Sequence, residues 1–122
     1  MAIEQLIERL RTAESPTRYL DARIAETMGW TKRIDMIRDE VTGEEKAVAT
    51  WIVPGGTEPG RVPYYTSNLQ HALDLAQQLV PAHVGGCSWE EGMGSARINE
   101  GPYVQAMNPQ TALCIAALLS LR

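Results

Sequence analysis

Apolar residues recur at helical spacing near the start of the chain. Ile3, Leu6 and Leu10 lie three or four positions apart, with charged residues between them, which predicts an amphipathic helix over residues 2–12. Ser15 and Pro16 then have the residue types of an N-cap and a first helical position. They predict a second helix that runs to about Met28 and stops at Gly29.

The pattern changes from helical to extended after Trp30. Residues 33–39 and 46–53 are rich in β-formers, and the polar segment 40–44 between them contains Gly43. These features predict a β-hairpin. The following segment, 54–60, holds three glycines and two prolines and is interpreted as a mobile surface loop.

The second half of the chain predicts a helix, short strands and a final helix. Thr66 or Ser67 is expected to cap the third helix, and Pro81 to end it. Glycine-rich breaks then separate candidate strands at 86–91, 95–99 and 103–107. The last helix, 109–121, is apolar over most of its surface and should lie in the core. This order predicts an α+β fold, an antiparallel sheet of about four or five strands covered by helices as in an α-β-α sandwich.

Composition limits the size and the partners of the protein. The chain has 122 residues, which predicts a single domain over 1–122. Its formal net charge of −4 argues against binding a nucleic-acid polymer, because phosphate neutralisation needs a basic surface. A small anion remains possible as a ligand, since it needs only a few well-placed donors.

Cysteine usage and hydropathy favour the cytoplasm. Cys87 and Cys114 form no Cys-x-x-Cys pair, and the first residues lack the pattern of a signal peptide. No segment approaches the roughly 18 consecutive apolar residues of a membrane span. We therefore expect free thiols, a reducing compartment and no membrane partner.

Catalytic and metal-binding motifs are missing. The chain contains no phosphate-binding loop, no His-Glu-x-x-His and no Gly-x-Ser-x-Gly. His71, His83, Asp74 and Cys87 could contribute to a metal site, but about three or four clustered ligands are needed and nothing else gathers near them. Thiol catalysis by Cys87 with His83 is a weaker alternative. No metal, cofactor or enzymatic activity is predicted.

The best candidate for a ligand site is the start of the third helix. A helix N-terminus offers free N–H groups and a positive dipole end to an anion. Thr66 and Ser67 add hydroxyl groups, Arg61 adds a positive charge, and Tyr64 and Tyr65 could stack on a base. The competing interpretation, which the residue types favour, is structural: Ser67 only caps the helix, one tyrosine is core and Arg61 is solvated.

Two residues further along the chain are secondary candidates for the same ligand. Trp89 lies in the glycine-rich segment 85–94, and Arg97 follows it. Because aromatic bulk is scarce in this chain, Trp89 is predicted to be a core residue rather than a stacking platform.

Three stretches together resemble the phage ABA sandwich domain family of small phage and prophage proteins. They are Met28-Gly29-Trp30 after the helix pair, Pro63-Tyr64-Tyr65-Thr66-Ser67-Asn68-Leu69, and the closing segment that starts at Asn108-Pro109. The family name implies a sheet covered by helices. The resemblance implies no catalytic positions, and residues 31–60 match it least.

The resemblance and the candidate anion site give a first hypothesis. The protein would be a phage accessory protein in the cytoplasm of an infected or lysogenic bacterium. It would sequester a small anionic ligand, such as a cyclic or ADP-ribose-type nucleotide, as anti-defence sponges do. A homo-oligomer is implied by resemblance to such sponges. The alternative is a protein–protein interaction or structural phage protein without a small-molecule ligand, and a nucleotide-cleaving enzyme is the third hypothesis.

Overall fold

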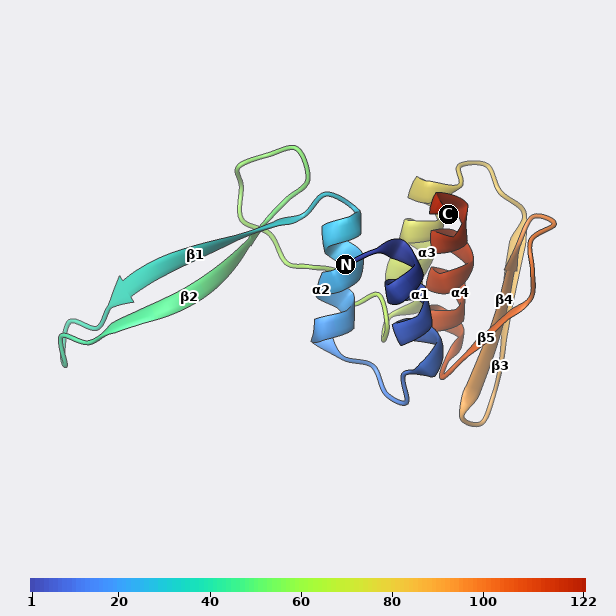
Figure 1. The fold of residues 1–122 in the computed structure, drawn as a ribbon, viewed down its shortest axis with the longest axis horizontal. Helices are drawn as coiled ribbons and strands as arrows, with labels where there is room; N and C mark the ends of the chain where they lie inside the picture. Colours follow the sequence, from blue (N-terminus) through green and yellow to red (C-terminus); the bar gives the residue numbers. More distant parts are fainter. The chain divides into compact units, whose positions relative to one another are not determined.

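A computed structural model describes all residues 1–122 (Figure 1). Its elements, in chain order, are α1 (Ile3–Thr12), α2 (Arg18–Thr27), β1 (Thr31–Arg38), β2 (Glu45–Ile52), α3 (Leu69–Leu79), β3 (Gly85–Glu90), β4 (Met93–Ile98), β5 (Val104–Ala106), α4 (Pro109–Leu118) and the 3₁₀ turn η1 (Leu119–Leu121). The prediction of an α+β fold with antiparallel strands is confirmed. The five strands form two sheets, β1–β2 and β3–β4–β5.

The chain divides into two compact units. Met1–Ile24 and Pro63–Arg122 form the first, called the helical unit below, and Ala25–Val62 form the second, the hairpin unit. Helix α2 begins in the first unit and ends in the second. The single domain over residues 1–122 stays a prediction.

Helix α4 is the centre of the helical unit. Every residue from Thr111 to Leu118 is buried, as its nearly uniform apolar sequence predicts. The helix contacts α1 and α3 as well as the inner face of the β3–β4–β5 sheet. It begins where predicted, because Pro109 occupies the first turn and the Asn108 side chain accepts a hydrogen bond from the Thr111 N–H at 2.7 Å.

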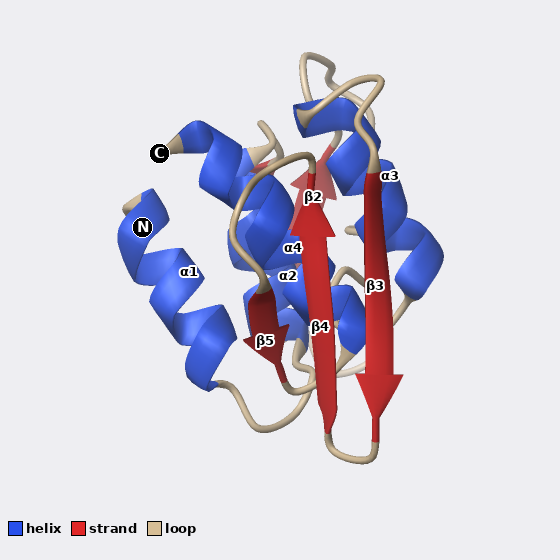
Figure 2. Cartoon of the chain, turned by 90° about the vertical axis from the view of Figure 1, so that its right-hand side faces the viewer, coloured by secondary structure: helices blue, strands red, loops and turns tan.

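The β3–β4–β5 sheet has one covered face and one open face. Gly94, Ala96 and Ile98 alternate along β4 and are buried toward α4, and the residues between them are half-exposed. The opposite face carries no helix (Figure 2). A Cβ added at Gly94 would lie 2.1 Å from the Pro109 nitrogen. Glycine at this position therefore lets the start of α4 approach the sheet backbone.

The hairpin unit consists mainly of β1 and β2. The strands pair antiparallel along their whole length, from Thr31 opposite Ile52 to Arg38 opposite Glu45. The turn is closed by Asp39, whose carboxylate accepts a hydrogen bond from the Val41 N–H, and by Gly43 at φ 73°.

The predicted mobile loop 54–60 is held at both ends. Its backbone is tied to β2 and the residue after it by hydrogen bonds from the Val53 N–H to the Glu58 carbonyl and from the Gly60 N–H to the Trp51 carbonyl. A side chain on Gly60 would collide with Val53 and approach the ring of Trp30 to 3.1 Å. The loop is thus packed onto the base of the hairpin.

Two predicted helix caps were wrong. The cap of α2 is Thr17, whose hydroxyl accepts a hydrogen bond from the Leu20 N–H at 3.2 Å, and not Ser15. The cap of α3 is Asn68, which accepts from the His71 N–H at 3.1 Å, and not Thr66 or Ser67. Sequence alone shows several hydroxyl and amide residues near each helix start, and the position of the first helical turn decides which one accepts.

Candidate functional site

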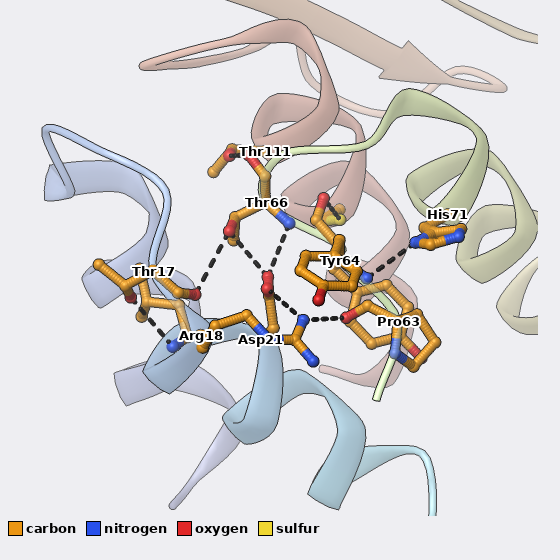
Figure 3. A network of polar contacts seen from close by, with 11 residues as sticks. Thr17, Arg18, Asp21, Pro63, Tyr64, Thr66, His71 and Thr111 are labelled. Carbon is orange, nitrogen blue, oxygen red and sulfur yellow. Dashed lines mark hydrogen bonds and ion pairs between the residues drawn. The ribbon is translucent and has the colours of Figure 1, made fainter. Parts of the chain in front are cut away.

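The loop before α3 is fastened to α2 by a buried carboxylate. Asp21 is 1% exposed, and its Oδ1 accepts hydrogen bonds from both the Thr66 N–H at 2.8 Å and the Thr66 hydroxyl at 2.7 Å (Figure 3). Arg18, one turn earlier on the same helix, donates to Asp21 Oδ2 at 2.8 Å and to the Pro63 carbonyl at 3.1 Å. This network joins two segments that lie 45 residues apart.

Helix α4 completes the environment of Thr66. The Thr66 carbonyl accepts a hydrogen bond from Asn108 Nδ2 at 2.9 Å and a longer one from the Thr111 hydroxyl at 3.5 Å. The Asn108 side chain therefore has two functions, since its amide oxygen Oδ1 also caps α4. The Thr66 N–H, hydroxyl and carbonyl are all engaged within the protein.

This arrangement changes the interpretation of the candidate anion site. Thr66 is fully buried, and both of its hydrogen-bond donors point to Asp21 rather than to solvent. The Asp21 carboxylate also places a negative charge where an anion was expected, which opposes anion binding. Thr66 is therefore a structural residue that positions the loop.

The adjacent tyrosine is a core residue. Tyr65 is 4% exposed, and its carbonyl lies 3.5 Å from the thiol of Cys114 on α4. Burial raises the pKa of Tyr65 to about 12, with smaller contributions from nearby Cys114, Asp21 and Asp74. Burial, followed by the charge of Asp21, also raises the pKa of the Cys114 thiol. Neither group offers a reactive anion at neutral pH, and Tyr65 cannot stack on a ligand.

Tyr64 occupies the surface side of the loop. The Arg18 guanidinium lies over the Tyr64 ring, 3.8 Å from its centroid. The backbone N–H of Tyr64 donates a hydrogen bond to His71 Nδ1 at 2.8 Å. Arg18 was not singled out from the sequence. Its spacing of three residues from Asp21 on a predicted helix could have indicated the ion pair, but its contact with Pro63 depends on the tertiary fold.

The remaining candidates in this stretch do not join one site within a unit. Ser67 is exposed in the helical unit, where its N–H donates to the Tyr64 carbonyl at 3.2 Å. Arg61 is exposed and belongs to the hairpin unit. A ligand site shared by Arg61, Tyr64 and Ser67 stays a prediction.

Arg97 lies in a different place, beside a shallow pocket of about 370 Å³ on the β3–β4 side of the sheet. It donates to the Gly101 carbonyl at 2.8 Å and to the Tyr103 hydroxyl at 3.2 Å, with its guanidinium 4.8 Å from the Tyr103 ring centroid. Ser88 and Ser95 line the same pocket and add hydroxyl groups. A cation, an aromatic ring and hydroxyl groups are thus combined in one open depression.

The prediction that Trp89 is a core residue was wrong. Its side chain is 75% exposed, because β3 is the outermost strand of the sheet. Trp89 does not line the pocket beside Arg97. The two secondary candidates therefore do not form a common site around that pocket.

The hairpin unit has an exposed apolar face that sequence reasoning did not identify. The strand register places Ile34 opposite Ala49 and Met36 opposite Ala47 on one face. Ile34 is 58% exposed and Met36 61%. Trp51 continues this face opposite Lys32, whose ammonium lies 6.0 Å from the indole ring centroid. Alternation along both strands was a usable signal, but the sequence does not show that one face has no cover.

Other potential chemistry is sparse. No group of three or more histidine, cysteine, aspartate or glutamate side chains is placed to hold a metal ion. His83 Nδ1 lies 2.8 Å from the Val80 carbonyl, and Cys87 is a half-buried free thiol. No helix of the protein has the length and apolar character needed to cross a membrane.

A scan against models of protein families, a search of curated proteins and a search of solved structures each found no match to this chain. The resemblance to the phage ABA sandwich domain family stays a prediction from sequence.

Proposed function

We propose that this protein acts as a protein-interaction module and that its β1–β2 hairpin binds the partner. The observation that carries the proposal is the apolar face formed by the exposed Ile34, Met36, Ala47 and Ala49 and the half-buried Trp51, called the hairpin face below. Contiguous exposed apolar surface on a folded protein is typical of an interaction site.

The energetics of a two-stranded sheet support the same proposal. An isolated two-stranded hairpin is marginally stable in water, and three strands or a packed face are normally needed. Fully burying a side chain such as Ile or Met contributes about 1.5–3 kcal/mol. A partner that covers Ile34 and Met36 would therefore stabilise the hairpin as well as the complex.

The charges on the hairpin face suit a partner with an apolar centre and a polar rim. Lys32 and Arg38 lie on the same face as Ile34 and Met36, toward its two ends. Protein interfaces commonly combine a desolvated apolar centre with charged residues at the periphery. The proposed partner is a folded protein in the same compartment, which we take to be the cytoplasm of the bacterial host.

The two faces of the hairpin provide a matched test. Ile34 and Ile37 are 58% and 54% exposed and lie on opposite faces of β1. We expect cross-linking in host cells, followed by mass spectrometry, to identify a protein that Ile34→Asp no longer captures and Ile37→Asp still captures. Equal capture by both variants, or no specific capture by the natural sequence, would contradict the proposal.

A small anionic ligand is a second candidate, favoured by the pocket beside Arg97 and Tyr103. In this proposal the ligand is a cyclic or ADP-ribose-type nucleotide, and the protein sequesters it without cleaving it, as a phage anti-defence sponge would. Ligand at about 100 times its dissociation constant would stabilise the fold by about 2.7 kcal/mol. Thermal shift against a nucleotide panel tests this, with Arg97→Ala and Arg61→Ala distinguishing the two candidate positions. No shift with any nucleotide argues against it.

A further inference from the structure

Strand β3 is an unprotected edge of the three-stranded sheet. It pairs with β4 on one side only, so the backbone groups along its other side have no strand partner. The opposite edge, β5, is three residues long and contacts α1. Every residue of β3 except Cys87 is exposed. An open edge of this length is a template for pairing with another strand.

We propose that β3 pairs antiparallel with β3 of a second copy of this chain, giving a two-fold symmetric dimer with a continuous six-stranded sheet. The dimer axis passes through the sheet beside Ser88, so that Ser88 lies opposite Ser88 of the second copy. A two-fold axis perpendicular to the sheet keeps both helix layers on one side. It also requires opposed residues to face the same way, which the Ser88 register satisfies.

The side chains of β3 are self-complementary in size. The strand begins with Gly85 and Gly86 and ends with Trp89 and Glu90. Antiparallel pairing centred on Ser88 places Trp89 of each copy opposite Cys87 of the other. An aromatic side chain over small cross-strand neighbours is a favourable arrangement in antiparallel sheets. Trp89, 75% exposed in the single chain, would gain cover in the dimer.

The charges are complementary in the same register. Glu90 lies opposite Gly86 of the second copy, and Gly86 pairs with Arg97 on β4. All three face the open side of the sheet, and a Cβ added at Gly86 would meet nothing within 4 Å. Glu90 and the second copy's Arg97 are thus separated by two strand spacings, about 9.6 Å between backbones, with no side chain between them. Glu90 can meet Arg97 of the second copy across Gly86 once the Arg97 guanidinium turns away from the Gly101 carbonyl and the Tyr103 hydroxyl.

The same geometry favours a second copy over an unrelated strand. Any extended peptide could satisfy the open backbone of β3. Only a second copy supplies the Glu90 and Arg97 pair twice, together with two exchanged Trp89 contacts. Charge and side-chain size therefore identify the strand that pairs with β3 as β3 of a second copy. The hairpin face proposed above takes no part in this pairing.

Gly86 offers a test with a matched control. Sedimentation equilibrium of the natural protein should give a mass that rises with concentration toward twice the monomer mass. Gly86→Glu places a carboxylate opposite Glu90 in both halves of the dimer, and we expect dimerisation to weaken about tenfold. Gly86→Lys adds similar bulk with the complementary charge and should dimerise at least as well as the natural chain.

Charge exchange makes the test specific to this register. Glu90→Lys alone should weaken the dimer, because it faces Arg97 of the second copy, and Gly86→Glu combined with Glu90→Lys should restore it. Circular dichroism checks that each variant is folded. If the Gly86 variants do not fold, Glu90→Lys alone tests the proposal. A natural protein that stays monomeric to about 1 mM, or equal weakening by Gly86→Glu and Gly86→Lys, would overturn the proposal.

Discussion

The hydrogen bonds between Thr66 and Asp21 give the most direct test of the structure. Thr66→Val keeps the shape of the side chain and removes only the hydroxyl, which donates to Asp21 Oδ1 at 2.7 Å. A hydrogen bond to a charged group contributes about 1.5–3 kcal/mol, and both residues are almost fully buried, so solvent cannot replace it. We expect Thr66→Val to lower the free energy of unfolding by about 2 kcal/mol.

Asp21→Ala should cost more than Thr66→Val. It leaves the Thr66 N–H and hydroxyl without an acceptor and removes the charge that faces Arg18. Two hydrogen bonds to a carboxylate correspond to about 3–5 kcal/mol. A double-mutant cycle by urea denaturation, with Asp21→Ala, Thr66→Val and the double variant, isolates the interaction between the two side chains.

The cycle also defines the result that would refute the network. We expect a coupling free energy of about 1–2 kcal/mol, because only the hydroxyl bond is shared by the two substitutions. The exposed pair Glu8 and Arg11 is the control, with side chains 58% and 60% exposed, and Glu8→Gln should change stability by less than about 0.5 kcal/mol. A coupling below about 0.5 kcal/mol, the largest change expected at the exposed pair, would show that Thr66 and Asp21 are not in contact.

Two further predictions concern the core. The pKa values of Tyr65 and Cys114 are raised in the folded chain above their ordinary values of 10.0 and 9.0. As pH rises, these two groups therefore ionise in the unfolded chain before they ionise in the folded chain. The free energy of unfolding consequently falls as pH rises above about 9. Urea denaturation between pH 8 and 11 should show this loss, with a shallower slope for Cys114→Ala; identical slopes would contradict the burial of the thiol. Gly94→Ala should destabilise the fold by about 3 kcal/mol or prevent folding, because the new Cβ overlaps the Pro109 backbone. Gly86→Ala is its control and should leave the thermal midpoint almost unchanged; equal effects would place α4 away from Gly94.

Local signals in the sequence determined most of the secondary structure. Asn108-Pro109 before an apolar run predicts both the start and the burial of α4, because the cap and the core residues lie within one segment. The hairpin turn around Gly43 is equally local. The caps of α2 and α3 were missed for the opposite reason, since each helix start offers several residues with the same capping chemistry and the final choice depends on where the helix docks.

The candidate site depended more strongly on the tertiary structure. Arg61 to Ser67 looked like an anion site because it combined donors with an expected helix N-terminus. Asp21, 45 residues from Thr66, accepts both of the donors on Thr66, and no local pattern could place it there. Trp89 illustrates the same limit, because its exposure follows from the position of β3 at the sheet edge.

The sequence by itself determined the α+β class, the antiparallel strands and the apolar central helix, because periodicity and turn residues act over a few positions. Only the tertiary structure decided that the strands form two sheets, that Thr66 is turned inward to Asp21, and that Ile34 and Met36 are left exposed. These outcomes depend on which distant segments meet. The type of a residue determines which interactions its side chain can make. Its neighbours in space determine whether that side chain contacts a ligand, a partner protein or the core.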